Sequence, residues 1–337
     1  MKPSAIAEYV LDSLVNHSQK GVANRLRNAA FTRVRALLAR DRTRFVRYNL
    51  DGTELLLPLA HDMPLYRRGF ADYSSNIGRI AFYLAAKYRD LAIVDIGANV
   101  GDTAAIVRAR CQAPMLCIEG DDFYFKLLLD NIDRSHLEGI QPCYAFVGTS
   151  QGEMRGGLER KAGTASFVAD ANRSVATVRL TEILSRFPTF EQAKLVKIDT
   201  DGLDCQILNS ELEWLAKAKP VAFIEYDPDF TQKQGYDARR VFRDMQSIGY
   251  RLGIFWENTG EHLLTTELAN APLLEDLHCY YSGRGGGKYA DIAFVHEEDH
   301  DLGLEMRRAE VEYFQRKLDN TAHSNPNGGS SGSAGMR

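Results

Sequence analysis

Long apolar segments are missing from this sequence of 337 residues. No stretch approaches the ~18 consecutive apolar residues that a membrane-spanning helix needs, so we expect no transmembrane segment. The first 22 residues contain Glu8 and Asp12 and lack an apolar core that ends in small residues. We therefore do not expect a secretory signal.

Cysteine is scarce and is poorly placed for cross-linking. The five cysteines are an odd number, and no two of them follow the C-x-x-C spacing. This pattern disfavours a disulfide framework and a structural zinc site, and it is typical of proteins in a reducing compartment. We expect a cytoplasmic protein whose cysteines behave as small buried apolar residues.

The composition is that of an ordinary globular protein, with 45% apolar and 26% charged residues. It excludes disorder of the whole chain. The net charge of −4 is unevenly distributed, because residues 1–50 hold ten basic side chains and three acids. This segment carries +7 and the remainder −11, so a basic N-terminal segment precedes an acidic body.

Residues 22–40 predict an amphipathic basic helix. Five apolar residues recur at helical spacing, and five arginines occupy the other positions: Val22, Leu26, Ala30, Val34 and Leu37 with Arg25, Arg27, Arg33, Arg35 and Arg40. Residues 44–59 predict a hairpin that turns at Asp51-Gly52. Three roles stay open for residues 22–47: packing on the acidic body, peripheral contact with the inner face of a membrane, or contact with a nucleic acid. The last is least favoured, because the net charge is negative and no aromatic platform is present.

From residue 91 onward, short apolar strands alternate with helices. The predicted strands are 91–97, 115–120, 143–148, 195–199 and 221–227, followed by two closing strands at 251–258 and 291–297. Such alternation favours an α/β fold of Rossmann-like type, with a mostly parallel seven-stranded sheet and an antiparallel edge hairpin. We expect a basic extension over 1–74, the sheet domain over 75–300, a helix over 301–319 and a disordered Gly/Ser-rich tail over 320–337.

The strongest motif is Asp95-Ile-Gly-Ala-Asn-Val-Gly101, between the first strand and its helix. Gly97 permits a tight turn, and Gly101 lets the helix pack close to the sheet. The spacing differs from the G-x-G-x-x-G dinucleotide fingerprint, and no G-K-[ST] follows. Asp95 so close to the loop disfavours a pyrophosphate and suits a cationic or zwitterionic ligand. The alternative is a turn that binds no ligand.

Glu119 ends the second predicted strand, 24 positions after Asp95. An acid there can accept hydrogen bonds from both hydroxyls of an adenosyl ribose. By itself it could equally be a surface acid beside Asp121 and Asp122. The motif upstream favours the functional interpretation.

Together, VDIGANVGDT, CIEG, KIDTDGLD (197–204) and FIEYD (223–227) resemble the FkbM family of S-adenosylmethionine-dependent methyltransferases, over roughly residues 75–300. The resemblance implies the class I methyltransferase fold, S-adenosylmethionine as cofactor, and O-methylation of a hydroxyl on a carbohydrate or natural product. The implied cofactor-binding residues are Asp95, Gly97, Asn99, Gly101, Asp102, Thr103 and Glu119. Two departures are Asp201-Gly202-Leu203-Asp204, where many members have Glu-Gly-x-Glu, and CIEGDD, where Glu-Pro is usual.

A sugar hydroxyl needs a general base or a metal as it accepts a methyl group. Asp199 and Asp201 follow the fourth parallel strand and are the candidate catalytic residues. Asp204 and Glu225 could join them around a divalent cation, or these acids could serve the turn and a helix cap. Lys197 should find a carboxylate partner on its buried strand, and His278 is an alternative base.

Two loops could also face the ligands. By the family resemblance, residues 73–76 could close over the methionine end of the cofactor, and the glycine run 283–287 suits a loop near the acceptor. Two other functions stay open. One is a nicotinamide-dependent oxidoreductase and the other is a methyltransferase-like module that binds partners without turnover.

Overall fold

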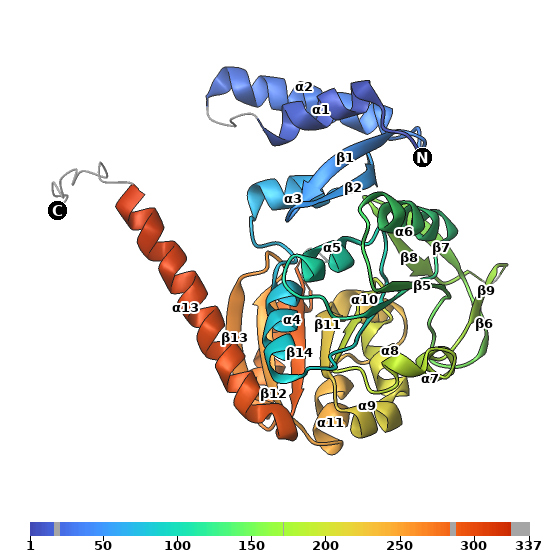
Figure 1. Cartoon of the computed structure of the whole chain (residues 1–337), viewed down its shortest axis with the longest axis vertical. Helices are drawn as coiled ribbons and strands as arrows, with labels where there is room; N and C mark the ends of the chain where they lie inside the picture. Colours follow the sequence, from blue (N-terminus) through green and yellow to red (C-terminus); the bar gives the residue numbers. More distant parts are fainter. Residues whose placement is uncertain (17–20, 171, 284–287, 325–337) are drawn as a thin grey trace.

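The structure is a computed structural model that describes residues 1–16, 21–170, 172–283 and 288–324. Its centre is a large sheet (Figure 1). The sheet begins with five parallel strands, in the spatial order β5, β4, β3, β10, β11. Their bounds are Ile140–Tyr144, Met115–Glu119, Ile93–Ile96, Leu195–Ile198 and Val221–Tyr226. β3, β4 and β10 are buried along their whole length. This burial explains why these strands read as continuous apolar runs.

Three antiparallel strands extend the sheet beyond β11: β14 (Ala290–His296), β12 (Tyr250–Glu257) and β13 (His262–Glu267). The predicted fold class is therefore confirmed, but the sheet has eight strands instead of seven. The two closing strands pair directly without forming a hairpin, because β13 and helix α12 (Ala271–Tyr281) lie between them in the chain. β13 was missed because its polar, half-exposed sequence at the sheet edge lacks an apolar run.

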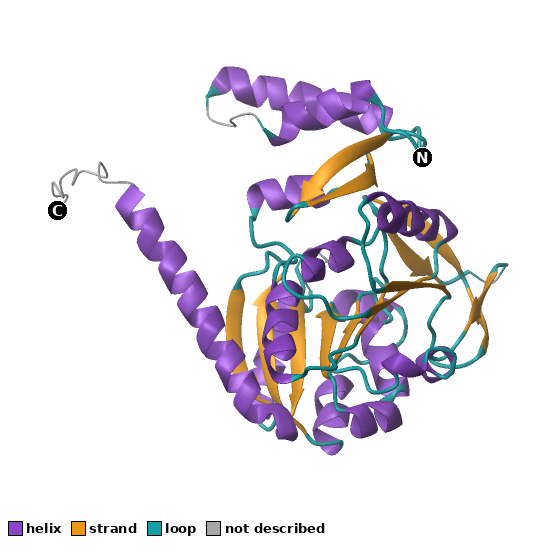
Figure 2. Ribbon diagram, viewed as in Figure 1, coloured by secondary structure: helices purple, strands orange, loops and turns teal. Residues whose placement is uncertain are grey.

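Helices cover both faces of the sheet (Figure 2). One core joins α4 (Asn76–Lys87), α5 (Asp102–Arg108), α6 (Asp122–Arg134) and the start of α13 (His300–Ser324). The other joins α7 (Leu180–Leu184), α8 (Asp204–Ser210), α9 (Leu212–Ala218), α11 (Arg240–Ser247) and α12. α10 (Pro228–Lys233) follows β11. The parallel strands therefore all end at the same edge of an open sheet that helices cover on both faces.

Residues 149–180 contain two pairs of short antiparallel strands. β6 (Gly152–Arg155) pairs with β9 (Ser174–Thr177), and β7 (Gly157–Lys161) pairs with β8 (Thr164–Val168). The β7–β8 hairpin turns at Ala162 and Gly163, and this turn forms part of the functional site.

The N-terminal extension contains α1 (Ala5–Val15), α2 (Val22–Leu38), the hairpin β1–β2 (Phe45–Leu50 and Thr53–Pro58) and α3 (Met63–Gly69). The Asp51-Gly52 turn is confirmed. Asn131 of α6 fastens the hairpin to the core, because its Oδ1 accepts from the Leu56 amide at 2.7 Å and its Nδ2 donates to the Leu56 carbonyl at 3.1 Å. α1 was not predicted, although it buries Ala7 and Leu11 in the core.

Packing of α2 on the body through its apolar residues would require these residues to be buried, and they are not. No side chain of α2 is buried, and Val22, Leu26 and Leu37 are exposed.

At the other end of the chain, α13 begins one residue before its predicted start and continues through residues 320–324, which were predicted as the start of the disordered tail, so this part of the prediction is wrong. The rest of that tail, 325–337, lies outside the described residues. All five cysteines are free thiols. No helix in the described ranges is long and apolar enough to cross a membrane.

Candidate functional site

A cavity of about 390 Å³ opens where β3, β4, β10 and β11 end. This is the edge at which open α/β sheets present their ligands, and the volume lies in the range of small-molecule sites. Five of the seven predicted cofactor-binding residues and both predicted catalytic residues line the cavity: Gly97, Asn99, Asp102, Thr103, Glu119, Asp199 and Asp201. The fold thus brings together motifs that are 100 residues apart in the sequence.

The turn after β3 is shaped by its neighbour β10. Gly97 has φ +82°, and a Cβ there would lie 1.8 Å from the Asp199 carbonyl oxygen. Any side chain would therefore push the end of β10 away from β3. The glycine is needed for this close backbone approach, in addition to the tight turn that the sequence suggests.

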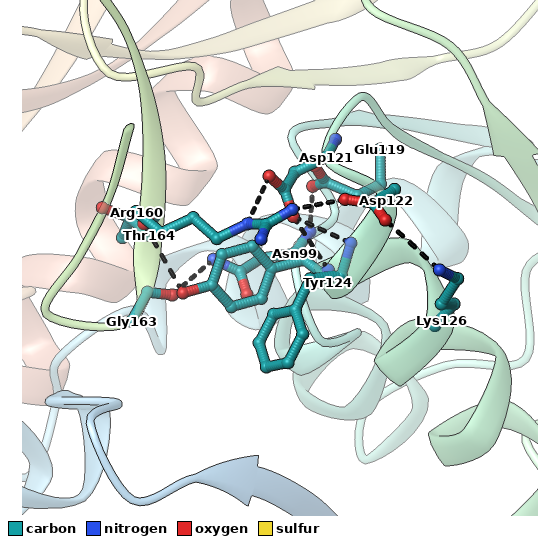
Figure 3. Close-up of polar contacts among 10 residues, drawn as sticks. Asn99, Glu119, Asp121, Asp122, Tyr124, Lys126, Arg160, Gly163 and Thr164 are labelled. Atoms are coloured by element: carbon teal, nitrogen blue, oxygen red, sulfur yellow. Dashed lines mark hydrogen bonds and ion pairs between the residues drawn. The ribbon is translucent and has the colours of Figure 1, made fainter. Parts of the chain in front are cut away.

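Glu119 organises the wall beside this turn (Figure 3). Its Oε2 accepts from the Asn99 amide at 2.7 Å, and its Oε1 accepts from the Asp121 amide at 2.6 Å. Asn99 itself adopts a left-handed conformation with φ +48°, which asparagine tolerates better than most residues. Burial raises the pKa of Glu119 to about 7, against the lowering effect of the two amides. Each carboxylate oxygen retains acceptor capacity for a ligand.

The β7–β8 hairpin closes over Glu119 and its surroundings, as Figure 3 shows. Asn99 Nδ2 donates to the Gly163 carbonyl at 2.9 Å. Arg160 Nε donates to Asp121 Oδ2 at 2.7 Å, and its Nη2 pairs with Asp122. The sequence shows no sign of this contact, because it joins the hairpin to residues about 40 positions earlier.

Beneath the cavity, Lys197 links the first and fourth parallel strands. Its Nζ lies 3.3 Å from Asp95 Oδ1 and 3.1 Å from Asp199 Oδ2. Burial opposes the charge of Lys197, but Asp199 and Asp95 outweigh this and raise the lysine pKa well above its ordinary value. Burial raises the pKa of Asp95 to about 6, although Lys197 lowers it. The predicted carboxylate partner of Lys197 is therefore present.

Asp95 and Gly101 do not line the cavity directly. Asp95 is fully buried and has Lys197 as its neighbour, which leaves it behind the wall that a ligand would touch. Gly101 begins α5 with φ +89°, and a Cβ there would lie 3.0 Å from Leu128 of α6. This agrees with the predicted need for close packing.

The three aspartates after β10 have different environments. Asp204 is buried and holds the turn, because its carboxylate accepts from the amides of Thr200 at 2.9 Å and Gly202 at 3.1 Å. It braces the preceding turn, whereas Asp199 and Asp201 face the cavity. Burial, and then the charge of Asp199, raise the pKa of Asp201 to about 6.

Two further acids lie at the same end of the cavity and were not assigned to catalysis from the sequence. Glu225 on β11 is opposite Asp291 on β14 in the antiparallel register, and both line the cavity. Asp291 Oδ2 accepts from Asn76 Nδ2 at 2.7 Å, and burial raises its pKa to about 7. Burial raises the pKa of Glu225 well above its ordinary value. Their proximity depends on strand pairing, which the sequence does not specify.

Other predicted residues have mixed outcomes. Tyr73, Ser74 and Asn76 line the cavity, as expected for the segment 73–76. His278 lies on α12, where its Nδ1 is 2.8 Å from the Tyr226 hydroxyl, and it is not part of the lining. It is therefore poorly placed as a base for this cavity. Of the glycine run 283–287, residues 284–287 lie outside the described residues.

His61, from the extension, was not predicted as a site residue. It lines the cavity, and its Nδ1 accepts from the Met63 amide at 3.3 Å. Burial lowers its pKa to about 4, so the ring is neutral at pH 7. Because Nδ1 is the acceptor, Nε2 carries the proton, and this buried donor has no protein partner among the described residues. Within those residues, no group of three or more His, Cys, Asp or Glu side chains is arranged to hold a metal ion.

Several solved methyltransferases are similar to this chain. The precorrin-6y C5,15-methyltransferase of Geobacter metallireducens is 11% identical, with 65% of this chain and 87% of that one covered and a TM-score of 0.36. The O-methyltransferase of Bacillus cereus, in complex with SAH, is 13% identical; 65% of this chain and 80% of that one are covered, with a TM-score of 0.37. The methyltransferase FkbM of Methylobacillus flagellatus is 15% identical; 49% of this chain and 40% of that one are covered, with a TM-score of 0.36. No protein-family model and no curated protein matches the sequence. At such low similarity, function has to be argued from the site itself.

Proposed function

We propose that this protein is an S-adenosylmethionine-dependent O-methyltransferase that acts on a hydroxyl group of a carbohydrate. The observation that carries this proposal is a single cavity with two kinds of wall. Glu119 ends β4 on one side of the turn over residues 97–103, and Asp199 and Asp201 follow β10 on its other side, because β3 lies between β4 and β10 in the sheet. Between them they supply adenosine-binding groups and a base. The motif resemblance to the FkbM family supports the same assignment.

The residues on the first wall fit the proposed cofactor. Glu119 offers free acceptor capacity for ribose hydroxyls, at the strand end where an acid usually serves this purpose. The glycine turn leaves bare backbone beside it, and His61 offers an unpartnered buried N–H. Bound there, S-adenosylmethionine would supply an electrophilic methyl group.

On the second wall, Asp201 is the stronger candidate for the base. With its pKa raised to about 6, Asp201 is ionised at pH 7, and this pKa is close enough to 7 for the carboxylate to accept a proton efficiently. Asp199 is 3.1 Å from Lys197 Nζ, and this ion pair fixes its carboxylate. We assign to Asp199 the positioning of the acceptor and of Asp201. Asp95 acts through Lys197 and is a positioning residue.

The acceptor end of the cavity suits a polyhydroxylated molecule. Glu225, Asp291 and Asn258 line it together with the aromatic rings of Tyr73 and Tyr289. Carboxylates and amides accept hydrogen bonds from hydroxyl groups, and aromatic faces pack against the apolar faces of sugar rings. This combination supports a carbohydrate in preference to an apolar natural product.

Ligand binding discriminates the candidate functions. In a thermal-shift assay, S-adenosylhomocysteine should raise the melting temperature while NAD should not. Stabilisation by NAD alone would favour the oxidoreductase, and no response to either would favour a binding module. Transfer of label from the methyl group of the cofactor to a glycan extract, with and without EDTA, then tests turnover and the metal alternative.

A further inference from the structure

Helix α2 packs on the protein with a face that mixes arginine and apolar side chains. The side chains that turn toward the rest of the extension are half-buried and include Arg27, Phe31, Arg35 and Leu38. Arg27 Nη2 donates to the Ser13 carbonyl at 3.2 Å, and Phe31 makes an edge contact with Tyr9 at 5.9 Å between ring centroids. Leu38, at the end of the helix, packs against the core. The inner face of this helix is thus held by both polar and apolar contacts.

Arg35 is the strongest of these attachments. Its guanidinium donates to the carbonyls of Leu59 at 2.9 Å and His61 at 3.0 Å, and it pairs with Asp62 at 2.7 Å. His61 and Asp62 are wall residues of the cavity. The orientation of α2 is therefore fixed through the same segment that borders the functional site.

The opposite face of α2 is apolar and open to solvent. Val22, Leu26 and Leu37 are 73%, 69% and 60% exposed, and Ala30 lies between them on the same side of the helix. A surface helix of a globular protein normally turns such a stripe toward the core. Here the arrangement is inverted, so the stripe is available to something outside the described protein.

The charges around this stripe indicate which kind of partner the stripe contacts. Residues 22–40 contain five arginines and no acid. Arg25, Arg33 and Arg40 are exposed, and no described residue forms an ion pair with them. Arg33 lies seven positions after Leu26 and four before Leu37, so it shares their side of the helix. Apolar side chains with exposed arginines among and beside them complement a surface that is apolar inside and anionic outside, which is the interface of a bilayer with acidic lipids. A nucleic acid would use the arginines but would leave the leucines in water.

The position of α2 is compatible with docking on an extended flat surface. The α1–α2 pair forms one end of the molecule, beyond the β1–β2 hairpin (Figure 1). The sheet domain lies on the other side of that hairpin and would remain in water.

We propose that α2 is an interfacial anchor that docks this protein on an anionic lipid bilayer. Val22, Leu26 and Leu37 enter the boundary between headgroups and acyl chains, and Arg25, Arg33 and Arg40 contact lipid phosphates. A stripe of so few apolar residues gives reversible binding. Because α2 is tied through Arg35 to His61 and Asp62, docking would place that wall of the cavity near the membrane, within reach of an acceptor carried on a lipid if the proposed function holds.

The test is co-sedimentation of the full chain with sucrose-loaded vesicles, either pure phosphatidylcholine or 70% phosphatidylcholine with 30% phosphatidylglycerol. We expect binding only to the anionic vesicles, and release at high salt. Each arginine near an anionic surface is worth about a fivefold change in partitioning, so Arg25→Glu with Arg33→Glu should weaken binding by about 25-fold or more. Leu26→Ser with Leu37→Ser should weaken it about tenfold or more.

The matched controls lie on α13, which offers the same exposed residue types. Arg307→Glu with Arg308→Glu, and Val311→Ser with Leu318→Ser, should bind vesicles as the wild type does. Unchanged melting temperatures show that the α2 variants are folded. Equal binding to neutral vesicles, wild-type binding by the α2 variants, or equal loss in the α13 variants would overturn the proposal. An absence of vesicle binding would also overturn the proposal. RNA binding through Arg25 and Arg33 would then indicate a nucleic-acid site, and a dimer that Leu26→Ser with Leu37→Ser dissociates would indicate a protein interface.

Discussion

The two ends of the cavity use carboxylates in contrasting ways. At the Glu119 end, each acid has its own partners, since Glu119 accepts from two amides and Asp121 pairs with Arg160. At the Asp201 end, Asp199, Asp201, Glu225 and Asp291 line the cavity together, and Lys197 forms an ion pair with Asp199. Burial raises pKa values at both ends, but two backbone amides oppose it at Glu119, whereas the charge of Asp199 adds to it at Asp201. The first end is therefore suited to holding a ligand and the second to moving a proton.

The sharpest way to break this contrast is to remove the proposed base. Asp201→Asn keeps the shape of the side chain but cannot accept a proton at neutral pH. We expect kcat to fall by about 10²- to 10⁴-fold, the usual contribution of a general base. The affinity for S-adenosylhomocysteine, measured by calorimetry, should stay within about threefold, because Asp201 is assigned to the other end of the cavity.

The pH profile separates a base from a merely structural acid. Asp201 must be ionised to act, and its pKa is raised to about 6. The wild-type kcat/KM should therefore fall about tenfold for each pH unit below 6, and the residual activity of Asp201→Asn should lack this step. A full-rate Asp201→Asn enzyme, with the rate lost instead in Asp199→Asn, would transfer the role of base to Asp199.

The ion pairs of Lys197 provide the next test. Lys197→Met leaves Asp95 buried without its partner, and breaking a buried pair costs about 3–5 kcal/mol in the free energy of unfolding. Adding Asp95→Asn should recover part of this loss, because the unpaired buried charge disappears. Urea denaturation measures both effects, and Lys217→Met on the exposed face of α9 is the matched control. Wild-type stability of Lys197→Met would show that Asp95 needs no cation.

Much of the protein follows from local sequence. The buried strands β3, β4, β10 and β11 were predictable, because continuous apolar runs between turn residues have few other interpretations. The motif around Gly97 and the acid at Glu119 likewise located one end of the cavity. These features depend on residues that are close together in the chain.

The rest depends on contacts that no local pattern encodes. Glu225 and Asp291 meet only because β11 pairs antiparallel with β14. His61 reaches the cavity from the extension. The apolar positions of α2 were predictable as one face of a helix, but the direction of that face was not, because it depends on where Arg35 finds its partners.

The well-partnered end of the cavity is tested by Glu119→Gln. The amide would present N–H groups to one of the two backbone donors, so a hydrogen bond within the wall and acceptor capacity for ribose are both lost. Hydrogen bonds to a charged group are worth about 1.5–3 kcal/mol, and we expect the Kd of S-adenosylhomocysteine to rise about 10- to 100-fold. Asp122→Asn, an exposed neighbour, should change it less than about threefold. An unchanged Kd in Glu119→Gln would exclude Glu119 from cofactor binding.

The smallest effect should come from the hairpin that covers the Glu119 end. Arg160→Gln removes the ion pairs with Asp121 and Asp122 but leaves the hydrogen bond between Asn99 and Gly163. Partly exposed ion pairs contribute at most about 1 kcal/mol, so S-adenosylhomocysteine should dissociate about two- to fivefold faster in stopped-flow displacement, with little change in kcat. Arg251→Gln, which removes an exposed pair with Glu297 outside this hairpin, is the control and should leave dissociation unchanged. Equal effects of the two variants would mean that the β7–β8 hairpin does not retain the ligand. The difference between the two ends of the cavity would then lie in the sheet edge alone.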